Sequence, residues 1–215
     1  MAKCDQNLLL FLTQDFINPK PDTTELITMH TDEFFDLIAS RRSIGNLNAP
    51  APTHAQVKRA VQLAYTAPDH KCLQPFRFIV LEGEALARLG DALHQATLDV
   101  GETDAKALDK ARNLPLRAPM VITCLTAYQA HTKVPPYEQL LAAGAAVQNL
   151  LLALHAMGFC SVWRTGALTD STAVKQFFAL DDSNHVVGFI YVGTTDVQMP
   201  ERAPLDLDSL LGYWA

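Results

Sequence analysis

The segment from Leu140 to Gly158 restricts most strongly what this chain can fold into, because it is long and almost entirely apolar. Its length approaches that of a membrane span, but Gln148, Asn149 and His155 interrupt it and no basic cluster flanks either end. These interruptions favour a buried core helix, so we expect no membrane partner.

We predict a helix from about Tyr137 to Met157, introduced by Pro135-Pro136 and followed by Gly158 in the C′ position. It is apolar on nearly every face, which is typical of a helix that is buried all round. Gly144 and the neighbouring alanines permit close packing. The helix is therefore expected at the centre of the domain or at the seam of a dimer.

The balance of charge argues against a general nucleic-acid binder. The chain has 215 residues and a formal net charge of -6, whereas such binders need excess positive charge to displace phosphate counterions. Four cysteines, at Cys4, Cys72, Cys124 and Cys160, form no C-x-x-C pair, so zinc ribbons and thioredoxin-like motifs are not supported. Isolated cysteines fit a reducing compartment. Because we also expect no signal peptide, we predict a cytoplasmic protein.

Helices and strands are expected to alternate along the rest of the chain. The predicted helices span Glu33–Ser40, the segment from the N-cap Thr53 to about Thr66, Glu84–Val100, Thr103–Asn113, and a segment from the cap Asp170 or Ser171 to about Ala179. The predicted strands span Phe76–Leu81, Met120–Thr126, Val186–Val192 and, as a short strand or extended segment, Phe159–Arg164. This order indicates an α/β or α+β sandwich around a mixed sheet.

The compact domain is predicted to cover residues 31–215. Residues 1–30 are interpreted as an N-terminal extension, because Asn18-Pro19-Lys20-Pro21-Asp22 has the composition of a turn or linker. Met29 is an alternative natural start.

Motifs of several enzyme classes are missing. The sequence contains no G-x-G-x-x-G, P-loop, H-E-x-x-H or G-x-S-x-G pattern, and no His/Cys/Asp cluster with metal spacing. A Rossmann dehydrogenase, a P-loop NTPase, a zincin and a typical α/β-hydrolase are therefore poorly supported, and we expect no metal site.

Three short segments are unusual. Arg41-Arg42-Ser43 follows a predicted helix directly, and its two guanidiniums and hydroxyl can form several charge-assisted bonds to one phosphate. Alternatively, it is the solvated basic end of a helix. The segment 67–71, Ala-Pro-Asp-His-Lys, is a polar turn that leads into a strand, and it is either a plain turn or part of a site. In the segment 163–168, Trp-Arg-Thr-Gly-Ala-Leu, the tryptophan either caps the core or contacts a ligand.

Together and in this order, the three segments resemble the nitroreductase family, in its short FMN-dependent subgroup of NAD(P)H nitroreductases. The resemblance covers about residue 31 to the C-terminus and includes Ala118-Pro119 and the strand Val-Gly-Phe-Ile-Tyr-Val-Gly. It implies an α+β fold, a three-layer sandwich with a central mixed, mainly antiparallel sheet flanked by helices. It also implies an intertwined homodimer with two FMN sites at the interface.

The resemblance also implies which residues bind the cofactors. Arg41, Arg42 and Ser43 would hold the FMN phosphate and ribityl chain, and Trp163, Arg164 and Thr165 would line the cofactor from the same subunit. Thr66 and His70 would reach FMN bound mainly by the other subunit. The nicotinamide nucleotide would contact the end of the long helix, at Ala153, Leu154, His155, Ala156, Met157 and Gly158. Thr66 and Cys72 depart from the family's usual residues, which leaves the substrate preference open.

The function implied is an FMN-dependent oxidoreductase. A hydride would pass from NADH or NADPH through FMN to a small acceptor such as a nitroaromatic or a quinone. FMN supplies the redox chemistry, so the missing catalytic triad is expected. The alternatives are a flavin or enone reductase on the same scaffold, a non-catalytic flavin-binding redox sensor, and a cofactor-free interaction protein.

Overall fold

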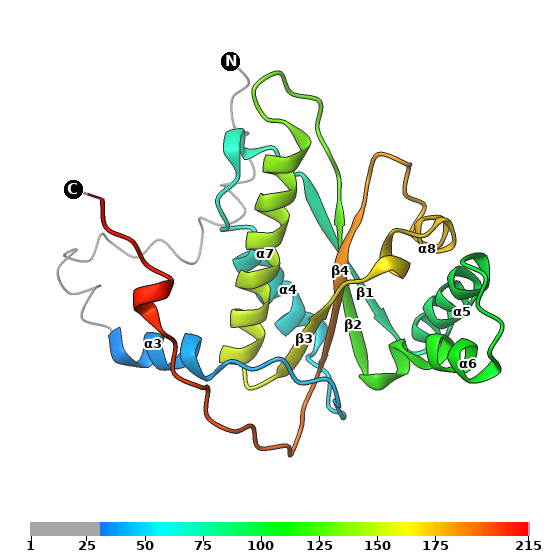
Figure 1. Cartoon of the computed structure of the whole chain (residues 1–215), viewed down its shortest axis with the longest axis horizontal. Coiled ribbons are helices and arrows are strands. Elements are labelled where there is room, and N and C mark those ends of the chain that lie inside the picture. Colours follow the sequence, from blue (N-terminus) through cyan, green and yellow to red (C-terminus); the bar gives the residue numbers. More distant parts are fainter. Residues whose placement is uncertain (1–30, 215) are drawn as a thin grey trace.

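The computed structural model of the chain describes residues 31–214 (Figure 1). The predicted N-terminal extension, residues 1–30, lies outside the described residues. The boundary at residue 31 therefore stays a prediction.

A four-stranded sheet forms the middle of the molecule. Its strands are β1 (Phe76–Glu82), β2 (Met120–Thr126), β3 (Cys160–Arg164) and β4 (Val186–Gly193), and their order is β1-β2-β4-β3. Every neighbouring pair of these strands is antiparallel. Among residues 31–214, a parallel component appears only as an isolated bridge between Ser43 and Ser161, at the β3 edge.

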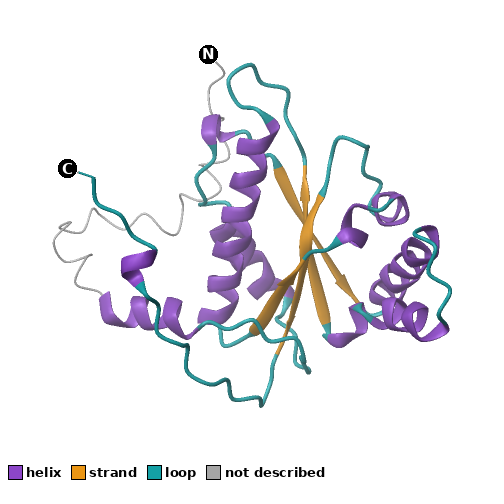
Figure 2. Ribbon diagram, viewed as in Figure 1, coloured by secondary structure: helices purple, strands orange, loops and turns teal. Residues whose placement is uncertain are grey.

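Helices cover both faces of the sheet and make three layers (Figure 2). The helices are α3 (Thr31–Ser40), α4 (His54–Ala64), α5 (Glu84–Asp99), α6 (Ala105–Asn113), α7 (Pro136–Ala156) and α8 (Thr172–Phe177). Short 3₁₀ turns are η1 (His70–Cys72), η2 (Pro115–Arg117), η3 (Ala167–Asp170) and η4 (Leu207–Ser209). Helices α4 and α7 lie on one side of the sheet, and α5, α6 and α8 lie on the other (Figure 1). The predicted α+β sandwich is confirmed.

Each face of the sheet has its own hydrophobic core, because side chains of a strand alternate between faces. On β2, Met120, Ile122 and Cys124 pack toward α4 and α7. Val121 and Leu125 of the same strand pack toward α5 and α8.

Local signals in the sequence explain several helix ends. Thr53 caps α4 through a full capping box with Gln56, as predicted. Ser171, one of the two predicted caps, accepts a bond from Val174 N and begins α8. Gly158 follows α7 with a φ of 84°, which favours glycine at this C′ position.

One bound and one prediction of burial need correction. The helix predicted over Glu84–Val100 ends at Asp99, and Val100 is 72% exposed. Helix α7 is not buried all round in the single chain, since Tyr137 and Leu141 are 63% and 68% exposed.

Helix α7 passes the length and composition test for a membrane span, yet half of its apolar window is buried inside the molecule. It packs against α4 and the sheet through Ala143, Val147, Leu150 and Leu154. This packing is that of a core helix.

Candidate functional site

The end of α3 brings two arginines to the edge of the sheet. The helix ends at Ser40, and the next residues run beside β3, where Ile44 N donates to Ser161 O at 3.2 Å. This pairing fixes the backbone of Arg41, Arg42 and Ser43 next to β3. A predicted phosphate-binding segment thus lies on a rigid edge and not on a free loop.

A cavity of about 350 Å³ opens beside this segment, and we call it the Arg41 cavity. Its polar lining comes from Ser40, Arg41, Arg42, His155, Ser161 and Glu201. The C-terminal tail, residues 197–201, forms one wall. Figure 1 shows the tail passing close to α3 and the lower end of α7.

The Arg41 guanidinium carries a buried donor without a partner. Its Nη1 atom is buried and makes no hydrogen bond. Burial, and then the charges of Arg202 and Arg42, lower the pKa of Arg41. An unpaired buried donor is costly, and an anion in the cavity would satisfy it. The cavity therefore fits a phosphate group.

Arg42 is bonded differently from its neighbour. Its Nη1 atom donates to Ala39 O at 2.7 Å and to Arg41 O at 3.2 Å, so it covers carbonyls at the end of α3. From the tail, Arg202 donates to the same two carbonyls. Of the two predicted arginines, Arg41 is the one with a free buried donor.

A second cavity, of about 490 Å³, lies on the other side of the segment Arg41–Ser43, and we call it the Trp163 cavity. It brings together four predicted residues, Ser43, Trp163, Arg164 and Thr165. Apolar side chains from α5 and β4, such as Leu93 and Tyr191, complete it. The structure therefore brings Ser43 and the Trp163–Thr165 segment together, whereas Arg41 and Arg42 line the neighbouring Arg41 cavity.

The two large side chains of the Trp163–Thr165 segment are both held in place. Trp163 Nε1 donates to Val187 O at 3.2 Å. The Arg164 guanidinium lies 5.6 Å from the centre of the Tyr191 ring, a cation–π contact, and its Nε atom is buried without a partner. A second unpaired buried donor thus borders the Trp163 cavity.

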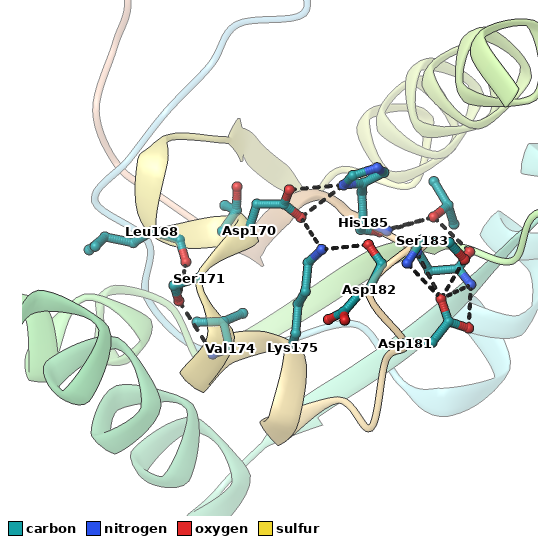
Figure 3. A network of polar contacts seen from close by, with 12 residues as sticks. Leu168, Asp170, Ser171, Val174, Lys175, Asp181, Asp182, Ser183 and His185 are labelled. Atoms are coloured by element: carbon teal, nitrogen blue, oxygen red, sulfur yellow. Dashed lines mark hydrogen bonds and ion pairs between the residues drawn. The ribbon is translucent and has the colours of Figure 1, made fainter. Parts of the chain in front are cut away.

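A polar network fixes η3, the turn that follows the Trp163–Thr165 segment (Figure 3). His185 Nδ1 lies 2.9 Å from Asp170 Oδ2, and Lys175 Nζ lies 3.5 Å from Asp170 Oδ1. Because Asp170 belongs to η3 and His185 directly precedes β4, the network ties η3 to the sheet. Within residues 31–214, no group of three or more His, Cys, Asp or Glu side chains is placed to hold a metal ion.

Thr66 and His70 lie elsewhere in the single chain. His70 Nδ1 is 2.9 Å from Glu138 Oε2, in the first turn of α7. His155, in the last turn, is 17 positions further along this helix, which corresponds to about 25 Å. The Oγ1 atom of Thr66 donates to Leu63 O at 2.7 Å and accepts from Asn149 Nδ2 of α7 at 3.4 Å. One chain therefore does not bring these two residues to the Arg41 cavity.

The end of α7 contributes one side chain to the Arg41 cavity. Ala153 and Leu154 are buried in the core, whereas His155 lines the cavity. Sequence reasoning placed His155 in the nucleotide segment by resemblance and did not connect it with Arg41. It also missed Ser161 and the tail, because neither stands in a motif.

Comparisons with known proteins find relatives of this chain. The model of the Nitroreductase family matches residues 38–194. A protein of Escherichia coli K12 named "Putative NAD(P)H nitroreductase YdjA" is 41% identical over 175 residues, which cover 79% of this chain and 95% of that protein. A "Putative NAD(P)H nitroreductase" of Haemophilus influenzae is 40% identical over 161 residues, 74% of this chain and 86% of the relative.

Solved structures share the fold. A nitroreductase-like family protein from Bacillus cereus superposes with a TM-score of 0.73 at 20% identity, covering 84% of this chain and 95% of that one. A mutant of NfnB from sphigopyxis sp. strain HMH, described as an FMN and NADPH-dependent nitroreductase, gives a TM-score of 0.65 at 16% identity, with coverages of 83% and 97%.

Proposed function

Because this chain belongs to the nitroreductase family, a family of oxidoreductases, we propose that it is an FMN-dependent enzyme that uses NADH or NADPH. The acceptor that we propose is a small nitroaromatic or quinone. Bound FMN would supply the hydride transfer, so the protein's own residues need only bind, orient and shield.

One observation supports FMN most strongly, namely the buried, unpartnered Nη1 of Arg41 in a cavity of about 350 Å³. In this proposal Arg41 binds the FMN phosphate, and Arg42 shapes the backbone beneath it. Ser43 stands between the Arg41 cavity and the Trp163 cavity, which suits a contact to the ribityl chain. Trp163 and Arg164 are already held by Val187 O and Tyr191, so the wall near the flavin is rigid before the ligand binds.

We also propose a homodimer in which each site takes Thr66 and His70 from the other subunit. The separation of about 25 Å along α7 keeps His70 away from Arg41 within one chain, and Thr66 does not line the Arg41 cavity. Exposed apolar side chains support such an interface, with Phe34 and Phe35 of α3 at 55% and 59% and Leu141 of α7 at 68%.

The proposal is tested first by the absorbance spectrum of the purified full chain, which should show bound flavin. Stopped-flow mixing with NADH and with NADPH should then bleach the flavin, and an acceptor screen should restore its colour. A chain that stays colourless with added FMN would contradict the proposal. Flavin that binds but is not bleached would favour the redox sensor, and preferred turnover of free flavins or enones would identify the related reductases.

A further inference from the structure

His155 lies where its charge would act directly on an anion in the Arg41 cavity. It stands in the last turn of α7 and lines the same cavity as Arg41 and Arg42. Its Nε2 atom is 2.9 Å from Ser40 Oγ, the residue directly before the arginine pair. The imidazole therefore joins the end of α7 to the end of α3.

The hydrogen bonds indicate which ring atom can take up a proton. The Ser40 hydroxyl donates to Leu37 O at 3.2 Å, so its oxygen is left to accept from His155 Nε2. In the neutral ring Nε2 thus carries the hydrogen, and Nδ1 is the acceptor. Uptake of a proton at Nδ1 would turn that atom into a donor.

With no anion bound, burial and Arg41 oppose this charge, whereas the Glu201 carboxylate favours it. Ser40 on α3 and Ser161 on β3 are neutral, and burial raises the pKa of the Cys160 thiol, which keeps it neutral as well. Arg41 and Arg42 line the cavity from the segment that follows α3, and the tail supplies Glu201, with Arg202 behind it. Burial, and then Arg41, lower the pKa of His155.

We propose that His155 is a proton-dependent ligand of the flavin phosphate, neutral in the free protein and protonated at Nδ1 when the phosphate lies in the Arg41 cavity. This rests on the proposed function, because it takes FMN as the ligand. A phosphate offsets the charge of Arg41 and stabilises the imidazolium, so binding takes up a proton from solvent. His155 thereby becomes a residue that positions FMN, in place of the nucleotide contact that the family resemblance implied.

The sign of the pH dependence follows from this linkage. Phosphate raises the pKa of His155 above its lowered value in the free protein, so the extra affinity is present at low pH and is lost as the pH rises through the pKa of the complex. The phosphate monoester itself also titrates, at about pH 6. Only the difference between wild type and a His155 variant therefore isolates the histidine.

The test compares the dissociation constants of FMN for wild type, His155→Gln and His155→Lys, in the full chain stripped of flavin. At about pH 6, His155→Gln should bind FMN about tenfold more weakly than wild type, and near pH 8.5 the two should agree. His155→Lys carries a permanent charge, so its affinity should exceed that of His155→Gln at the higher pH. Calorimetry in two buffers of different ionisation enthalpy should show less proton uptake by His155→Gln.

Controls separate this inference from the proposed function. His54→Gln removes an exposed histidine that is paired with Glu82 outside the cavity, and it should behave as wild type. Riboflavin, which lacks the phosphate, should bind wild type and His155→Gln equally. If FMN binds wild type with the same pH dependence and proton uptake as His155→Gln, the inference is overturned and the proposed function stands. If wild type binds FMN at no pH, both fail.

Discussion

At the scale of single residues, Arg41 and Arg42 are adjacent but are bonded for different tasks. The guanidinium of Arg42 donates to Ala39 O and Arg41 O, whereas the buried Nη1 of Arg41 has no partner. We therefore predict that Arg41→Ala raises the dissociation constant of FMN by about tenfold to a hundredfold, the value of one charge-assisted contact. Arg42→Ala should cost less affinity, and fluorescence titration measures both.

The matched control for Arg41 is Arg88→Ala, because Arg88 lies on α5, away from the Arg41 cavity. It should leave the FMN affinity unchanged. Riboflavin should lose little affinity for Arg41→Ala, since the missing contact is to the phosphate. Equal losses for FMN and riboflavin would show that Arg41 acts through folding and would contradict its role as a phosphate ligand.

At the scale of elements, β3 and β4 approach so closely that Gly188 cannot carry a side chain. Its φ is 157°, and a Cβ there would lie 2.1 Å from Trp163 Nε1 and 2.9 Å from Arg164 O. We predict that Gly188→Ala lowers the unfolding free energy by about 1–3 kcal/mol, because it overpacks this contact. It should also displace Trp163, which a shift in tryptophan fluorescence and weaker FMN binding would report.

Gly90→Ala provides a comparison with a similar clash at a different place. Its Cβ would lie 2.1 Å from Arg112 O, between α5 and α6. This variant should also unfold more easily, yet while folded it should keep the Trp163 fluorescence and the FMN affinity. If both variants changed FMN binding equally, Trp163 would have no particular part in the site.

The tail is the other element that acts on the site. Arg202 donates to Ala39 O and Arg41 O, and so it orients the segment that carries Arg41. We predict that Arg202→Ala lowers the affinity for FMN by about tenfold or less, and that Arg202→Lys recovers part of this loss. Unchanged FMN affinity in Arg202→Ala would show that the tail does not position Arg41.

The sequence predicts a feature well when the residues that determine it are close together along the chain. The caps at Thr53 and Ser171 and the apolar run of β2 are local signals, so the predicted elements match the observed ones to within a few residues. The exposure of Leu141 and the meeting of His155 with Arg41 depend on how distant elements pack. The same holds for the tail, which has no periodic pattern to place it. The roles of the predicted FMN residues stay predictions, although the structure gathers several of them.

At the scale of the whole molecule, the described chain leaves apolar surface exposed and keeps His70 away from the Arg41 cavity. Two layers of helices cover the sheet, yet Phe34, Phe35 and Leu141 stay exposed. Tail residues are exposed as well, with Leu210 at 67% and Trp214 at 99%. Burial of such surfaces between two copies would be favourable in water. We therefore predict that light scattering finds a dimer.

The shared-site geometry makes a sharper prediction, tested by mixing two variant chains. Arg41→Ala and His70→Ala should each form dimers in which both sites are weak. In a verified heterodimer, a shared site pairs Arg41 of one chain with His70 of the other. One site then carries both lesions, and the other site carries neither. Mixing should therefore restore about one site of wild-type affinity per dimer, counted by FMN titration.

The opposite outcome follows just as strictly from the alternative geometry. If Arg41 and His70 served the same site from one chain, every site in the heterodimer would keep one lesion, and mixing would restore nothing. The separation of about 25 Å along α7 argues against that arrangement. The pairing of His70 with Glu138 at 2.9 Å places it at the far end of the helix from the cavity. Failure to restore a site would thus remove His70 from the proposed interface, while the assignment of Arg41 would stand on its own FMN and riboflavin titrations.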